Sequence, residues 1–246
     1  TRLVTERASR AAVTQRAGRA ARQGPGVAYR LWEEAATAGL PPYDPPEIAE
    51  ADLSALLLDC ALWGVADPRT LRWLDPPGAA ALDEARRRLA ALGALDESGR
   101  PTAHGRALAA LPLPPRLAHM LVAGAARGWG RTAAVVAVLL SERGLGGNDA
   151  DLEVRARRWA SERGPRAEAG RRLAERWRRL AGADDGSGEI GACIALGFPD
   201  RVAKRRGADG ADWISVGGRG FRLAPASPLA RAEWLAVAET QGTAAG

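Results

Sequence analysis

The stretch "LGALDESGRPTAHGRALAALPLPPRLAHML", residues 92–121, joins two kinds of structure and decides the fold expected for the whole chain. Its first part predicts two short extended pieces around a turn at Ser98-Gly99. Its second part, from His104 onward, has the apolar spacing of helices. Because the segments before it are also predicted to be helical, the order is helices followed by a small hairpin, which is typical of a winged helix.

The chain after this stretch is predicted to be nearly all helical as far as about Gly182. It includes an arginine-rich amphipathic piece from Leu152 to Leu180. The apolar stripe of that piece consists of Val154, Trp159, Leu173, Trp177 and Leu180. Most of its arginines lie off the stripe, which favours a solvated face with arginine stems covering apolar neighbours. A polar break at residues 181–189 then separates a glycine-rich, extended last segment, with a predicted hairpin at 212–225.

The chain before the stretch contains four prolines within residues 39–48, and no helix or central strand runs through such a segment. We place a domain boundary there. A helix is expected after it, from Pro46 to Gly64. Before it, we expect a helix capped by Ser9 and running to about Gln23, with short strands at 2–7 and 26–32. The expected fold class is mainly α, multidomain α+β, with a small β-rich segment at the end.

Composition narrows the class of protein. The 246 residues are 46% apolar and 26% charged, as in ordinary globular domains, and the net charge is +6. Lys204 is the sole lysine among 35 basic residues. Arginine binds phosphate bidentately, but a GC-rich coding sequence also explains this bias. Cys60 and Cys193 lie far apart with no CxxC, so neither a zinc site nor a disulfide framework is indicated. No apolar run is long enough for a membrane span, and we expect a cytoplasmic protein.

One basic cluster has informative spacing. In "TQRAGRAARQGPG", residues 14–26, Gln15, Arg19 and Arg22 stand at i, i+4 and i+7 and share one helical face. Gly18 lies on that face too, and a close approach by a ligand or another backbone is a natural reason for a glycine within a helix. Arg16 points elsewhere. A glutamine and two guanidinium groups beside a small residue form a plausible clamp for a triphosphate, whereas a solvated basic helix is the alternative.

The cluster also carries a family resemblance. "QRAGRAAR", residues 15–22, resembles the QRxGRxGR signature of DEAH-box helicases within superfamily 2. The proline-rich exit, the segments 46–77 and 92–121, "GFPDRVAKRRG" and "GGRGFRL" resemble, in the same order, the accessory regions of bacterial HrpB-type ATP-dependent helicases. The resemblance divides the chain into the end of a second RecA-like domain (1–42), a winged helix (43–103), a helical ratchet domain (104–182) and part of a β-rich C-terminal region (189–246).

The resemblance also implies roles for individual residues. Arg19 and Arg22 would be arginine fingers, Gln15 would lie near the terminal phosphate and its attacking water, and Gly18 would permit the close fit. ATP and Mg²⁺ would be bound mainly by another domain. The family usually has glycine where this chain has Ala21, a change that keeps the finger spacing.

Two nucleotide-binding motifs of helicases, the phosphate-binding loop and the DEAH box, are missing from this sequence. The chain has no GxxxxGK[ST] loop, and Lys204 has no such glycine pattern before it. "DEAR", residues 83–86, looks like a DEAH box but lies after the arginine motif, inside a predicted helix. We therefore expect the chain to be part of a longer helicase, to bind neither ATP nor a metal by itself, and to be inactive alone. Its expected partners are the missing RecA-like domains and single-stranded nucleic acid, RNA rather than DNA, and no membrane.

Direct contacts to nucleic acid are harder to assign from the sequence. Arg100 in the expected wing and Arg116 beside two prolines are candidate phosphate contacts, although each is also explained as a structural arginine. Trp63 and Trp73 are expected in the core. His104 and His119 are expected at a helix start and a core edge. A stand-alone winged-helix nucleic-acid-binding or adaptor protein remains the main alternative, and a transcription regulator using the helix with Arg86–Arg88 is a third.

Overall fold

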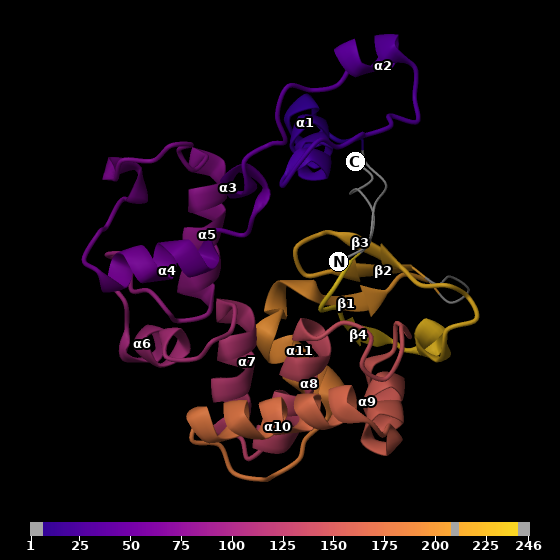
Figure 1. Ribbon diagram of the computed structural model, residues 1–246. Coiled ribbons are helices and arrows are strands. Elements are labelled where there is room, and N and C mark those ends of the chain that lie inside the picture. The colour runs from indigo at the N-terminus through magenta and orange to yellow at the C-terminus, as the bar shows by residue number, and fades with distance from the viewer. Residues whose placement is uncertain (1–6, 208–211, 241–246) are drawn as a thin grey trace.

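The computed structural model describes residues 7–207 and 212–240. Within these residues the fold is mainly helical with one small sheet, which confirms the expected fold class (Figure 1). The α-helices are α1 (Arg10–Gly18), α2 (Glu34–Ala38), α3 (Glu47–Glu50), α4 (Ser54–Leu62), α5 (Ala79–Ala91), α6 (Ala103–Ala109), α7 (Pro115–Ala125), α8 (Gly130–Ser141), α9 (Leu152–Ser161), α10 (Pro165–Leu180) and α11 (Ile190–Gly197). The strands are β1 (Val202–Arg205), β2 (Asp212–Ser215), β3 (Gly220–Arg222) and β4 (Trp234–Ala236). The strand expected at 2–7 lies almost wholly outside the described residues.

The segment predicted to be a winged helix contains α4, α5 and α6 with a hairpin between α5 and α6. The hairpin is reduced to one antiparallel bridge, between Leu95 and Pro101. Its turn is held by the Asp96 carboxylate, which accepts from the backbone N–H groups of Ser98 and Arg100, each at 2.9 Å. Gly99 has a φ of +77°, a left-handed conformation that glycine adopts without strain. The predicted turn therefore forms where it was expected.

The helix expected from Pro46 to Gly64 is interrupted. It divides into α3 and α4, because the Asp52 carboxylate accepts from the Ser54 N–H at 2.9 Å and from the Ser54 hydroxyl at 2.6 Å. A short acidic side chain that takes up a backbone donor in this way favours a new helix start over continuation. The division changes the local path of the chain but leaves Leu57 and Leu58 in the core.

The helical layer is formed by α7 to α11, with α8 at its centre. Met120, Leu121, Val136 and Val138 are fully buried there. The single arginine-rich piece expected from 152 to 180 is wrong: Gly164, with a φ of +113°, separates α9 from α10, which begins at Pro165. Proline fits the first turn of a helix and cannot continue one, so the two helices can pack on α8 independently.

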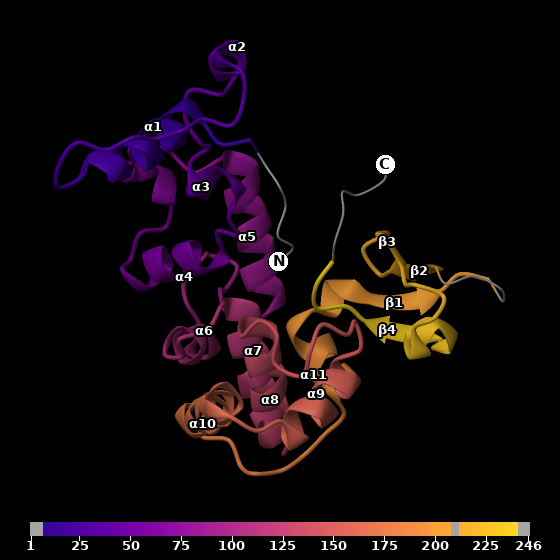
Figure 2. The same cartoon turned by 45° about the vertical axis from the view of Figure 1, so that its right-hand side comes forward.

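The C-terminal segment is not wholly extended, because it begins with α11, an apolar helix that packs on α7 and α8. The predicted hairpin at 212–225 is confirmed as β2 and β3. Two strands that the sequence did not reveal complete an antiparallel sheet of order β3-β2-β1-β4. Trp213, completely buried, anchors a small second core beneath this sheet, together with Ala203 and Leu235. Figures 1 and 2 show the sheet on the opposite side of the helical layer from α4.

The strand expected at 26–32 does not form. The segment is irregular, and Val27, Tyr29 and Leu31 are 73%, 85% and 93% exposed. The alternation typical of a strand is present, but a strand needs a neighbour for its backbone hydrogen bonds, and no described strand pairs with it. The pattern therefore indicates a preference for strand structure, but no described strand is available to pair with this segment.

Candidate nucleotide and nucleic-acid sites

The arginine-motif helix α1 is fixed to the molecule at its N-terminal end. The Ser9 hydroxyl accepts from the Ala12 N–H at 3.1 Å, which confirms the predicted cap. The N–H groups of Arg10 and Ala11 donate to the carbonyl oxygens of Pro41 and Pro42, at 2.8 and 3.1 Å. The proline-rich exit thus satisfies the free donors of the first turn and holds the helix in place.

The C-terminal end of this helix tightens into a 3-10 turn, Arg19–Ala21, and the backbone of Arg22 stays helical. In a 3-10 helix the residues at i and i+3 lie almost one above the other, about 6 Å apart along the axis. Arg22 is therefore placed directly over Arg19. The predicted common face is retained, and the tighter winding aligns the two arginines better than an α-helix would.

The face is open and its polar groups are available. Gln15, Arg19 and Arg22 are exposed, and none of these side chains has a hydrogen bond or ion pair with any other described residue. A Cβ placed on Gly18 would have nothing within 4 Å. No residue within 7–207 and 212–240 explains the glycine, so among these residues the space beside it is free for a ligand or another domain. Arg16 is also exposed, about 100° around the helix from Gln15.

A second glycine, Gly26, lies directly against the 3-10 turn Arg19–Ala21. A Cβ on Gly26 would lie 1.9 Å from the Ala20 carbonyl oxygen and 2.9 Å from the Ala21 nitrogen. No side chain fits there, so the loop after the helix passes directly against the backbone of the turn. The sequence "QGPG" suggested only a helix stop, and this contact was not foreseen.

The two candidate phosphate contacts are placed differently. Arg100 is exposed on the wing and lines, with Arg106, a shallow hollow of about 600 Å³ beside the end of α4. Arg116 is buried, and its guanidinium donates to both oxygens of Asp200, at 2.6 and 3.0 Å, and to the Gly197 carbonyl at 3.1 Å. These bonds favour the structural explanation of Arg116, while Arg100 keeps a reachable guanidinium.

The expected burial of Trp63 is wrong. It caps α4 at its C-terminal end and is 86% exposed, and Gly64, with a φ of +83°, turns the chain away immediately after it. Leu57, Leu58 and Ala61 form the buried face of α4, and a residue two positions after Ala61 lies on the opposite side. The helical period could therefore have predicted this. Trp73 is only half-buried, and its indole N–H donates to the Pro68 carbonyl at 2.7 Å.

The two histidines form a pair that the sequence did not predict. His104 on α6 and His119 on α7 are joined by a ring-to-ring hydrogen bond of 2.8 Å between Nε2 and Nδ1. Burial lowers the pKa of both rings, that of His119 to about 4, with the positive charges of His104 and Arg127 acting in the same direction. At neutral pH the pair is uncharged and links α6 to α7.

The described ranges contain no cluster of three or more His, Cys, Asp or Glu residues placed to hold a metal ion. Among the same residues, no helix combines the length and the apolar character needed to cross a bilayer.

Comparison with known proteins gives related sequences and structures. The ATP-dependent RNA helicase HrpB of Escherichia coli (strain K12) is 39% identical over 235 residues, which are 96% of this chain and 28% of that protein. The probable ATP-dependent RNA helicase DHX34 of Mus musculus is 42% identical over 116 residues, 47% of this chain and 10% of that protein. No protein-family model matches the chain.

The structures agree with the sequences. A crystal structure described as the Escherichia coli DEAH/RHA helicase HrpB matches with a TM-score of 0.79 at 36% identity, covering 95% of this chain and 29% of that one. A second, described as the E. coli DExH-box NTPase HrpB, matches with a TM-score of 0.77 at 35% identity over 98% of this chain. The chain thus spans less than a third of the relatives that it matches along almost its whole length.

Proposed function

Because this chain is a homologue of HrpB-type DEAH-box helicases over almost its whole length, we propose that it is the C-terminal part of an ATP-dependent RNA helicase. In this proposal it supplies the arginine side of the ATP site and part of the channel for a single strand. The observation that carries the proposal is the exposed common face of Gln15, Arg19 and Arg22 within a chain of this ancestry.

The residues of this face fit the phosphates of ATP. Three side chains that donate hydrogen bonds extend from one side of a fixed helix, and the open space at Gly18 lets another surface approach. Bound ATP supplies a terminal phosphoryl group whose oxygens gain negative charge during transfer. Arg19 and Arg22 donate N–H groups to these oxygens, and Gln15 orients the attacking water through its side-chain amide. We assign Mg²⁺ and the phosphate-binding loop to a preceding domain.

The segment 26–32 supports the same assignment. Its alternating exposed residues, Val27, Tyr29 and Leu31, have the pattern of a strand that adds to a sheet. We propose that it pairs with the sheet of the RecA-like domain to which α1 belongs. Such pairing would bury these side chains and fix the helix in the correct position relative to ATP.

The strand channel is the remaining part of the proposal. Winged-helix and helical regions would form one wall of it, with Arg100 as a phosphate contact on the wing. Binding through backbone phosphates would release counterions, so affinity should fall as the salt concentration rises.

The test uses the longer protein that contains this chain. We expect ATP hydrolysis that is stimulated by single-stranded RNA more than by DNA of the same sequence, measured as steady-state turnover at fixed salt. Stimulation by DNA alone would contradict the RNA assignment. Absence of nucleic-acid-stimulated hydrolysis would contradict the proposed function.

A further inference from the structure

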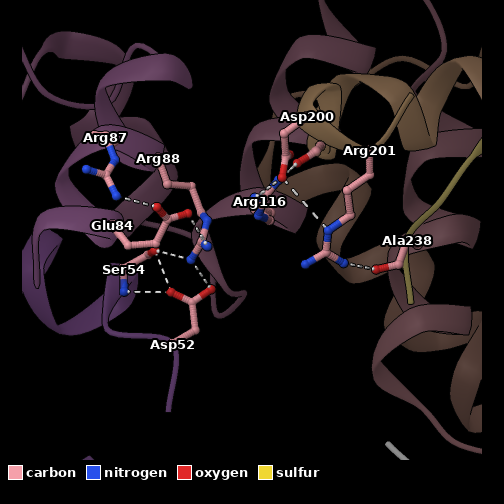
Figure 3. Close-up of polar contacts among 10 residues, drawn as sticks. Asp52, Ser54, Glu84, Arg87, Arg88, Arg116, Asp200, Arg201 and Ala238 are labelled. Carbon is pink, nitrogen blue, oxygen red and sulfur yellow. Dashed lines mark hydrogen bonds and ion pairs between the residues drawn. The ribbon is translucent and has the colours of Figure 1, made fainter. Parts of the chain in front are cut away.

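The joint between the helical layer and the sheet contains an unusual arrangement of charge. Arg116 and Arg201 both stack on Phe198, with guanidinium carbons 5.2 and 5.3 Å from the ring centre. Asp200 lies between the two arginines, but both of its oxygens are taken by Arg116 (Figure 3). Arg201 Nε remains 3.9 Å from an Asp200 oxygen, too far for a hydrogen bond. One carboxylate therefore serves two partly buried cations.

The Arg201 guanidinium is held in place, but only some of its N–H donors have hydrogen-bond partners. One terminal nitrogen donates to the Ala238 carbonyl at 2.7 Å. Its Nε is buried without a hydrogen-bond partner, as is that of Arg116, and its other terminal nitrogen has no bond to any described residue. A buried donor without an acceptor is costly, and such groups in native proteins call for an explanation such as an ion or ligand.

A glycine-rich turn brings a further arginine to this position. The Val216 N–H donates to the Val202 carbonyl at 3.1 Å, which places the β2–β3 turn beside the start of β1. A Cβ on Gly217 would lie 3.7 Å from the Asp200 carbonyl oxygen. In the same turn Arg219 is exposed, and its guanidinium has no partner among residues 7–207 and 212–240. Because the turn carries two glycines, Gly217 and Gly218, a ligand can approach its backbone closely.

The electrostatics agree with this geometry. Burial lowers the pKa of the Arg201 guanidinium below its ordinary value, and the like charge of Arg116 lowers it further. Arg219 and Arg88 act in the same direction, whereas Asp200 opposes them. The terminal nitrogens of Arg88, which comes from α5, are bound by Asp52 and Glu84 at 2.6 and 3.0 Å, whereas its Nε is also buried without a hydrogen-bond partner (Figure 3). Positive charge from several segments is thus concentrated around Arg201.

We infer that Arg201 and Arg219 form a binding site for a phosphate group of a nucleic-acid backbone, with Arg116 and Asp200 positioning Arg201. A phosphodiester accepts from two guanidinium groups at once and supplies the missing negative charge. The inference rests on the proposed function, because that function provides the strand. It adds two candidate nucleic-acid contacts, Arg201 and Arg219, in the C-terminal segment, whereas the earlier candidates lie in the arginine motif and the expected wing.

The experiment measures the affinity of the 246-residue chain for a single-stranded RNA oligonucleotide at several salt concentrations. The variants are Arg201→Gln and Arg219→Gln, of which the second changes an exposed side chain with no bonds to lose. The matched control is Arg179→Gln, on the outer face of α10, where the arginine is exposed and paired with Glu175. Thermal unfolding with and without inorganic phosphate forms a second arm.

We expect each test variant to lower the affinity roughly tenfold. The slope of log affinity against log salt concentration should become less steep by about the amount of one phosphate contact, and the control should be unchanged. Equal affinity and equal salt dependence in Arg219→Gln and the unchanged chain would overturn the inference. Stabilisation by inorganic phosphate that is lost in Arg201→Gln, without any change in RNA affinity, would instead assign the site to a free anion and also overturn it. If the unchanged chain bound no RNA at all, the strand channel of the proposed function would fail, and the phosphate arm would show whether an anion site exists.

Discussion

At the scale of single residues, three arginines of one motif occupy two different positions. Arg19 and Arg22 lie one above the other on the face of Gln15, whereas Arg16 lies on another side of the helix. In the longer helicase proposed above, Arg19→Ala or Arg22→Ala is expected to reduce ATP turnover by about 10³-fold, because each removes donors from the charge that would develop on the phosphoryl oxygens. The measurement is steady-state hydrolysis at saturating RNA.

Arg16→Ala is the matched control for this experiment, since it removes the same exposed side chain from the same helix. Its turnover is expected to stay within about twofold of the unchanged enzyme. Equal losses at all three positions would contradict the assignment of the face. Substitution of Ala21 by glycine, which restores the usual family residue, offers a complementary comparison.

A second prediction concerns the histidine pair. His119 takes up a proton in the folded chain only near pH 4, whereas in the unfolded chain it does so near 6.5. Between these values the unfolded state binds more protons, so the free energy of unfolding falls as the pH drops from about 6.5 to about 4. The loss should be about 1–2 kcal/mol, less than the full shift implies because the ring is partly exposed. Urea unfolding at several pH values measures it.

The control for this effect is His119→Asn, whose side-chain oxygen can accept in place of Nδ1 but does not titrate. The dependence of stability on pH in this range should be clearly weaker in that variant. An unchanged dependence would show that the acid sensitivity arises elsewhere, for example among the many carboxylates paired with arginine.

At the scale of elements, the contact between Gly26 and the 3-10 turn Arg19–Ala21 can be tested without changing Gln15, Arg19 or Arg22. Gly26→Ala places a methyl group 1.9 Å from the Ala20 carbonyl oxygen, so either the loop or the turn must move. We expect a loss of about 1–3 kcal/mol in stability. Because Arg22 follows the same turn, ATP turnover of the longer helicase proposed above should fall as well. Chemical denaturation and hydrolysis assays measure the two effects.

Gly24→Ala provides the control from the same loop, because a Cβ at Gly24 would have nothing within 4 Å. It should leave both quantities nearly unchanged. Comparable losses in the two variants would mean that the loop requires glycine for its conformation rather than for contact with the turn.

Elements also show how much of the fold the sequence could predict. Features with local causes were predictable, such as the Ser9 cap and the Ser98-Gly99 turn. The break at Asp52 was missed because apolar residues continue on both sides of it. The break at Gly164 was missed although the dipeptide Gly164-Pro165 is a helix stop that the sequence contains. β1 and β4 were missed because they are short and gain their order from pairing with distant strands.

The candidate site divides in the same way. The common face of Gln15, Arg19 and Arg22 follows from spacing alone, because α1, the 3-10 turn after it and the helical Arg22 form one continuous stretch. The site at Arg201 and Arg219 was not predictable, because a helix end and a turn meet there only after the sheet has formed. Trp63 is an intermediate case. The helical period of α4 places it on the exposed side, but its apolar sequence neighbours suggested burial.

At the scale of the whole molecule, the chain has one half of the proposed ATP site. The arginine side is present and exposed, while the phosphate-binding loop is absent from the sequence. The purified 246-residue chain is therefore expected to hydrolyse no ATP above the buffer rate, with or without RNA. Phosphate release monitored over hours is the measurement, and RNA-stimulated turnover by pure material would contradict the expectation.

The unpaired segment 26–32 has a consequence for the fate of this chain when it exists alone. Three large apolar side chains alternate along an extended backbone whose donors and acceptors lack a sheet, and such an edge is open to any strand that meets it. In a crowded cell this combination attracts chaperones and proteases, and at high concentration it promotes self-association. The residues proposed to complete a sheet in a longer protein would, in the separated chain, promote its degradation.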